Sequence, residues 1–148
     1  MIRRATYDDI PKLLEFGHQF VSLSPFAVVT VAHDESIDAT LKAMMASQDA
    51  EVFVVESKGQ VIGTGAVALA SLYFNVHIKV AHEVFWWIDP AYRHGSHGIR
   101  LLNTMEEWAA HHYAAVFVVS ALATNPHVNE MYARLGYIPN ETNHIKVL

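Results

Sequence analysis

The sequence YRHGSHGIRLL, residues 92–102, joins two parts of the chain that differ in hydrophobic pattern. Residues 80–88 before it form an apolar run that predicts a strand buried on both faces. The residues after it repeat apolar side chains at helical spacing, which predicts an amphipathic helix ending near His111. The apolar face of this helix consists of Leu101, Leu102, Met105, Trp108 and Ala109. The stretch is therefore a glycine-containing turn between a strand and a helix.

A turn of this kind exposes backbone N–H groups that the first turn of the helix cannot pair internally. The helix dipole adds partial positive charge at the same end. Arg93 and Arg100 add full charges, and no acidic residue follows until Glu106. Gly95 and Gly98 would allow the backbone to approach a ligand closely. The stretch therefore predicts a site for a phosphate or pyrophosphate group.

Two other interpretations of the stretch are a metal site and a turn that binds nothing. His94 and His97, with His111 and His112 along the helix, resemble a zinc-binding set, but no carboxylate lies among them. The sequence HEVFW also lacks the HExxH zinc motif, because Trp86 stands where the second histidine belongs. We therefore predict no metal. A turn without a ligand stays an alternative, since glycine-rich turns alone are a weak signal.

The composition bounds the class of protein. The chain has 148 residues, 52% of them hydrophobic and 17% charged, and no linker divides it, so we predict a single domain over 1–148. The net charge of −5 makes nucleic acid an unlikely partner. The absence of cysteine excludes disulfides and is typical of a reducing compartment. Because no signal peptide or membrane span is evident, we expect a cytoplasmic protein with no membrane partner.

The order of the remaining elements predicts the fold class. Acidic residues followed by apolar residues at helical spacing indicate two early helices, and β-branched runs around Lys58-Gly59 indicate a hairpin. Asn125, Pro126 and Gly136 are typical of the two ends of a short helix. We predict strands at 1–6, 51–57, 60–69, 80–88 and 115–122, helices at 7–20 and 34–46, and one or two short strands in 137–148. This order predicts an α/β (α+β) domain with a mixed, mostly antiparallel sheet and helices on both faces.

Residues 88–102, IDPAYRHGSHGIRLL, resemble the acyl-CoA loop of the GNAT superfamily of N-acetyltransferases. The family pattern is an apolar residue, any residue and Pro, then Arg or Gln-x-x-Gly-x-Gly or Ala before an apolar helix. The matching residues are Ile88, Pro90, Arg93, Gly98, Leu101 and Leu102. Ser96 stands in place of the first glycine, and Gly95 precedes it. Residues 125–137, NPHVNEMYARLGY, are similar to the second signature of the family. Its matching residues are Asn125, Tyr132, Leu135, Gly136 and Tyr137.

The resemblance implies a single-domain acyltransferase that moves an acetyl group from acetyl-CoA to a primary amine by direct attack. The amine would be a small molecule, a peptide N-terminus or a lysine. The loop would hold the pyrophosphate, and the adjoining strand edge would pair with the pantetheine arm. The residues that the resemblance assigns to the coenzyme are Trp87, Ile88, Arg93, His94, Gly95, Ser96, His97, Gly98 and Asn125.

The resemblance also implies a general base and a general acid. Glu83 is the first candidate for the base, because burial within a strand would raise its pKa. His82 is the second, since the family's carboxylate often lies six residues before the apolar residue of the loop signature. Glu83 is one residue off and faces the other way unless a bulge intervenes. Tyr132 is the candidate acid for the leaving thiolate. Purely structural roles for these side chains remain the alternative.

Two further hypotheses concern the function as a whole. A non-catalytic acyl-CoA-binding module would keep the same fold without turnover. A toxin that acetylates charged tRNA is the other, although the net charge of −5 argues against it. Asp34 and Glu35 would suit a cationic acceptor, and a homodimer stays open.

Overall fold

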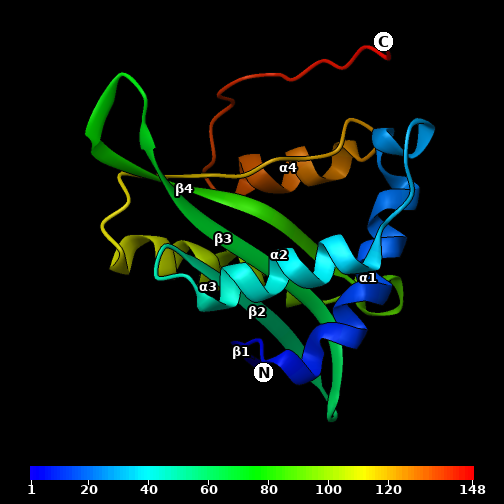
Figure 1. Cartoon of the computed structure of the whole chain (residues 1–148). Helices are drawn as coiled ribbons and strands as arrows, with labels where there is room; N and C mark the ends of the chain where they lie inside the picture. Colours follow the sequence, from blue (N-terminus) through cyan, green and yellow to red (C-terminus); the bar gives the residue numbers. More distant parts are fainter.

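A five-stranded sheet runs through the computed structural model, which describes residues 1–148 (Figure 1). The strands follow one another across the sheet in chain order. The first four pair antiparallel and the last pairs parallel with the fourth. This is a mixed, mostly antiparallel sheet, which is the kind of sheet that the sequence predicts. The strands are β1 (Ile2–Arg4), β2 (Ala50–Ser57), β3 (Gln60–Leu72), β4 (Asn75–Ile88) and β5 (Val116–Val118).

Four helices cover the two faces of the sheet, which confirms the predicted layers (Figure 1). They are α1 (Ile10–Leu23), α2 (Asp34–Ala46), α3 (His97–His111) and α4 (Pro126–Arg134). Short 3-10 turns, η1 (Tyr7–Asp9), η2 (Pro25–Val28) and η3 (Pro90–Tyr92), precede α1, α2 and α3. No helix has both the length and the apolar character needed to cross a bilayer.

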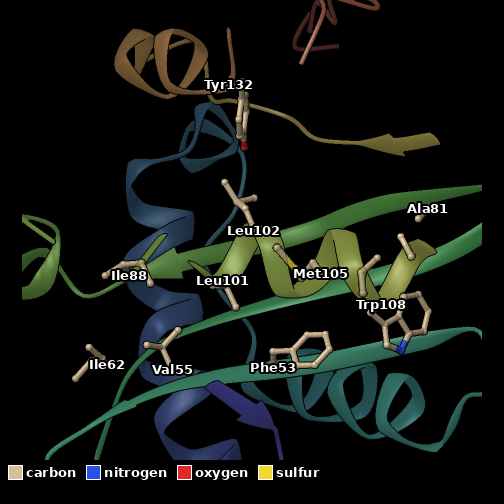
Figure 2. Packing of buried hydrophobic residues seen from close by; sticks show 12 residues of the cluster. Phe53, Val55, Ile62, Ala81, Ile88, Leu101, Leu102, Met105, Trp108 and Tyr132 are labelled. Carbon is tan, nitrogen blue, oxygen red and sulfur yellow. The ribbon is translucent and has the colours of Figure 1, made fainter. Parts of the chain in front are cut away.

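Alternation along the strands divides the core into two clusters. In β2, Val52 and Val54 pack against α1 and α2, whereas Phe53 and Val55 pack toward α3. Figure 2 shows the cluster on the α3 side of the sheet, which also contains Tyr132 of α4. The buried apolar face of α3 is the one that the sequence predicts, and its residues are Leu101, Leu102, Met105, Trp108 and Ala109. The cluster on the α1 and α2 side consists of Ile10, Leu13, Phe16, Leu41, Met44, Val52, Val54, Ala66 and Trp87.

The hairpin between β2 and β3 turns on two residues, as predicted. Lys58 (φ 50°) and Gly59 (φ 76°) both have positive φ, and Ser57 pairs with Gln60 across the turn. Two consecutive positive φ values give a two-residue turn whose twist matches that of the strands.

A β-bulge interrupts β4. The register pairs Ala66 with Phe85 and Val67 with Glu83, so Val84 is an additional residue on β4. A bulge shifts the alternation of the strand by one position beyond it. The alternation of side chains between the two faces of the sheet is therefore offset by one residue on the two sides of the bulge.

The bulge decides which face each neighbouring side chain occupies. Residues paired across antiparallel strands share a face. Val67, the partner of Glu83, belongs to the cluster under α3, and so does Trp86 beyond the bulge. Ala68, the partner of His82, packs with the cluster under α1 and α2. Glu83 and Trp86 therefore face α3 and α4, and His82 faces the other side.

Strands β4 and β5 separate soon after they meet. They pair only from Val80 to His82 on β4, and β5 ends at Val118, whereas β4 continues to Ile88. Residues 83–88 therefore leave one backbone edge without a partner strand. We call this edge the open edge of β4.

The structure corrects three expectations about strands. Residues 137–148 contain no strand, so β5 is at the edge of the sheet. β5 is also shorter than the predicted strand at 115–122. Val116 is 54% exposed, because no neighbouring strand covers it. In β4, His82 and Val84 are exposed, so this strand is not buried on both faces. A continuous apolar run in the sequence does not show whether helices cover both faces of the strand at every position.

Candidate functional site

The start of α3 presents six consecutive backbone N–H groups, those of residues 94–99, that donate to no protein acceptor. On either side the donors are paired, since Arg93 N–H bonds Pro90 and Arg100 N–H bonds Ser96 at 2.9 Å. The side chain of Ser96, at the N-cap position, makes no capping hydrogen bond. The positive end of the helix dipole therefore coincides with unpaired donors, which is the arrangement that binds phosphate groups.

Gly98 is required for packing as well as for access to the backbone. A Cβ at this position would lie 3.1 Å from Cζ3 of Trp86. Gly95 is different, because a Cβ there would meet only the ring of His97, at 3.5 Å. The close approach of α3 to β4 thus depends on Gly98.

Arg93 folds back onto the end of β4. Its Nε donates to the carbonyl of Ile88 at 2.8 Å, and its guanidinium carbon lies 4.3 Å from the ring centre of Trp87. Burial lowers the pKa of Arg93, and the charge of Asp89 opposes that effect. The carbonyl of Ile88 is therefore occupied, whereas both terminal nitrogens of Arg93 have no protein partner.

The histidines of the stretch do not form one cluster. His94 is exposed and His97 is half-buried at the start of α3. At the other end His111 and His112 bond through Nδ1 to carbonyls of their own helix. A helix of 15 residues is about 20 Å long, so the two pairs lie far apart.

A chain of hydrogen bonds connects β4, the segment after β5 and α4. Nε1 of Trp86 donates to the hydroxyl of Tyr132 at 2.9 Å, and this hydroxyl donates to the carbonyl of Ser120 at 2.9 Å. The N–H of Ser120 donates to Oε2 of Glu83 at 3.0 Å. One peptide segment after β5 thus holds a carboxylate and a phenol on the same face of the sheet.

The surroundings raise the pKa of both Glu83 and Tyr132. Burial raises the pKa of Glu83 to about 7, although the Ser120 hydrogen bond opposes the shift. Burial and the charge of Glu83 raise the pKa of Tyr132, and the Trp86 hydrogen bond opposes that effect. At neutral pH the carboxylate can accept a proton, and the phenol keeps its own.

His82 does not join this group. It faces the opposite side of the sheet, is exposed, and its side chain makes no hydrogen bond within the protein. The bulge at Val84 therefore brings Glu83, and not His82, together with Tyr132.

Two other predicted residues keep unused polar groups. Trp87 is 8% exposed and packs edge to face on Phe20, but its Nε1 has no acceptor. Asn125 lies at the N-cap of α4, as expected, yet its side chain makes no capping hydrogen bond.

Two residues of the network are not among the sequence candidates. Ser120 contributes only backbone groups, which leave no signal in the sequence. Trp86 is detectable only through its spacing of two from Ile88, which places both side chains on the face toward α3.

Comparison with known proteins identifies the chain's relatives. The model of the acetyltransferase (GNAT) family matches residues 18–137. No curated protein matches the chain.

Solved structures share the fold over almost their whole length. A mutant of the BH1408 protein from Bacillus halodurans has a TM-score of 0.82 and 15% identity, covering 100% of this chain and 99% of that one. A GNAT family acetyltransferase from Staphylococcus aureus gives 0.71 and 17%, covering 100% and 98%. An aminoglycoside acetyltransferase from an uncultured soil sample, in complex with sisomicin, gives 0.75 and 13%, covering 100% and 95%. At these identities the likeness establishes the fold.

Proposed function

The chain belongs to the acetyltransferase (GNAT) family, and we propose that it is a single-domain enzyme, over 1–148, that transfers an acetyl group from acetyl-CoA to a primary amine. The observation that carries this proposal is the arrangement of Glu83 and Tyr132 around the backbone of Ser120. A proton acceptor and a proton donor lie on one face of the sheet, next to a strand edge that has no partner. Amine acetylation needs both groups at one place.

The unpaired N–H groups of residues 94–99 support a pyrophosphate site. The free terminal nitrogens of Arg93 add charge-assisted donors there. Hydrogen bonds of this kind contribute about 1.5–3 kcal/mol each. A micromolar complex corresponds to about 8 kcal/mol, so a few such contacts support coenzyme affinity in that range.

The open edge of β4 supports binding of the amide-bearing pantetheine arm. Backbone groups of residues 83–88 on this edge lack a partner strand and can pair with amides. The carbonyl of Ile88 is the exception, because Arg93 occupies it. Trp87 is not a candidate for such a contact, because its carbonyl oxygen faces Gly63 of β3, where an added Cβ would be 2.8 Å away. By strand alternation the N–H of Ile88 faces the open edge and is the better candidate.

In the proposed reaction one side chain takes a proton from the amine, and another gives a proton to the leaving thiolate. The amine nitrogen, having lost a proton to Glu83, bonds to the carbonyl carbon of the acetyl group. The carbon–sulfur bond then breaks, and the thiolate takes a proton from the hydroxyl of Tyr132. As the amide forms, its nitrogen gives up a second proton, which returns through solvent to the oxygen of Tyr132. Glu83 releases the first proton to solvent. The net change is an ammonium and a thioester converted into an amide, a thiol and one released proton.

The acceptor that we propose carries a protonated amine on an apolar body. The end of α1 and the segment between α1 and α2 expose apolar side chains, and the acidic Asp34 and Glu35 follow at the start of α2. The exposed apolar residues are Leu23, Phe26, Val28, Val29 and Val31. An acidic helix start beside apolar surface suits a cationic, partly apolar amine.

Two measurements test the proposal. Acetyl-CoA at millimolar concentration should raise the melting temperature, and thiol release should follow with at least one member of an amine panel. The panel contains alkyl and aryl monoamines, a polyamine, an aminoglycoside and a lysine peptide. Glu83→Gln should reduce thiol release at least tenfold, whereas His82→Ala should change it less than twofold. Absence of any stabilisation refutes the coenzyme site, and stabilisation without turnover supports a binding module instead.

A further inference from the structure

Trp86 contacts both halves of the proposed site. The six-membered ring of its indole lies against Gly98 in the first turn of α3, where an added Cβ would be 3.1 Å away. The opposite side of the same indole donates its N–H to the hydroxyl of Tyr132 at 2.9 Å. One rigid side chain thus spans the distance from the unpaired backbone donors to the phenol.

The first turn of α3 lies next to the indole, with no room for a side chain at Gly98 between them. Gly98 N–H is one of the six unpaired donors, so a ligand held by these donors fixes the first turn of α3. Because an added Cβ would be 3.1 Å from the ring, no side chain fits between this turn and the indole, and a marked shift of the turn toward β4 displaces the ring. Trp86 is also half-buried in the cluster under α3, which prevents it from turning away.

The contact with Tyr132 sets the direction of the hydroxyl hydrogen. Trp86 donates to the phenolic oxygen, so the hydroxyl hydrogen points away from Trp86 and toward Ser120. The same N–H faces the oxygen that becomes negative when the phenol gives up its proton. A donor placed at an oxygen that gains charge stabilises the state after proton transfer.

We propose that Trp86 is a positioning residue that connects the backbone donors at the start of α3 to the hydroxyl of Tyr132. Binding of the coenzyme's phosphates at the donors fixes the indole, and the indole fixes the phenol that protonates the leaving thiolate. This inference rests on the proposed function, and it adds a residue that contacts the hydroxyl of Tyr132 but neither the phosphates nor the thioester.

A double-mutant cycle separates positioning from packing. Trp86→Phe removes the hydrogen bond, and kcat for the best amine of the panel should fall about three- to tenfold, with KM for acetyl-CoA within about threefold. In a Tyr132→Phe background the same substitution should leave kcat unchanged within twofold, because its target is gone. An equal fall in both backgrounds overturns the proposal. Trp108→Phe, a buried indole of the same cluster that does not contact Tyr132, is the matched control and should lower kcat equally in both.

Indole N–H signals in ¹H–¹⁵N spectra test the connection without turnover. The chain has three tryptophans, so each signal is assigned by one Trp→Phe variant. The Trp86 signal should move in Tyr132→Phe, and in the wild type it should move on titration with coenzyme A. If Trp86→Phe does not fold, Trp87→Phe and Trp108→Phe assign the signal by elimination.

The outcomes distinguish the two proposals. Amide signals of residues 94–99 that shift with coenzyme A while the Trp86 indole stays fixed overturn the connection and leave the coenzyme site intact. Spectra that do not change at all with coenzyme A overturn the proposed function, and the connection with it. A Trp86 signal unchanged in Tyr132→Phe overturns the hydrogen bond itself.

Discussion

Replacing Glu83 by Gln should inactivate the protein and stabilise it at the same time. Burial raises the pKa of Glu83 from 4.5 to about 7, so the folded protein binds this proton more tightly than the unfolded chain. The free energy of unfolding therefore falls as pH rises from about 4.5 to about 7, and it stays lower above pH 7. At about 1.4 kcal/mol per pKa unit, the loss at pH 8 is at most about 3.5 kcal/mol.

Gln removes this loss because it carries no charge, and its amide oxygen can still accept the N–H of Ser120. The buried amide keeps part of the desolvation cost, so we expect a gain of about 1–3 kcal/mol at pH 8. A domain of this size gains about 2–4 °C in melting temperature per kcal/mol. Urea denaturation at pH 8 and at pH 4.5 should therefore show Glu83→Gln more stable at pH 8 and similar to the wild type at pH 4.5.

Glu107→Gln is the control for the loss of one negative charge. Glu107 is exposed on α3, and its side chain makes no ion pair, so its replacement should change stability little at either pH. A Glu83→Gln protein that is no more stable than the wild type at pH 8 would refute the desolvated carboxylate. An equal gain at both pH values would do the same, because the gain must follow the ionisation of Glu83.

Four further substitutions test the fold. Gly63→Ala should lower the free energy of unfolding by about 1–3 kcal/mol in urea denaturation, because a Cβ there meets a backbone carbonyl of β4 at 2.8 Å; an unchanged midpoint would contradict the packing of β3 on β4. Gly136→Ala should cost about 1–2 kcal/mol from backbone strain alone, since φ is +89° and the space is open, and Gly59→Ala at φ +76° should cost a similar amount by the same measurement. Asp9→Asn should destabilise the protein at pH 7, because the guanidinium of Arg3 lowers the pKa of Asp9; that loss should shrink toward low pH, where the wild-type carboxyl becomes protonated, and a loss independent of pH would exclude the ion pair.

The elements that depend on local chemistry can be predicted from the sequence. Lys58-Gly59 predicts its hairpin because few residues adopt two positive φ values in succession. The apolar stripe of α3 predicts its buried face because a helix repeats every 3.6 residues. The position of the unpaired donors follows from the same boundary between strand and helix, so the turn at 92–102 is predictable without any structure.

Pairing between strands accounts for what the sequence does not show. The bulge at Val84 is a property of the register between β3 and β4, and nothing in residues 80–88 marks it. Without the bulge, alternation gives Glu83 and Trp86 opposite faces. The role of Ser120 is equally hidden, because its backbone bonds two distant side chains. The missing strand in 137–148 depends on whether β5 offers a partner, which is again a tertiary property.

A crystal structure of the chain with acetyl-CoA tests the central claim most directly. The pyrophosphate oxygens should lie within hydrogen-bonding distance of backbone nitrogens in residues 94–99, and the thioester should lie between Glu83 and Tyr132. Phosphates bound elsewhere, with those six N–H groups still unpaired or facing solvent, would contradict the account.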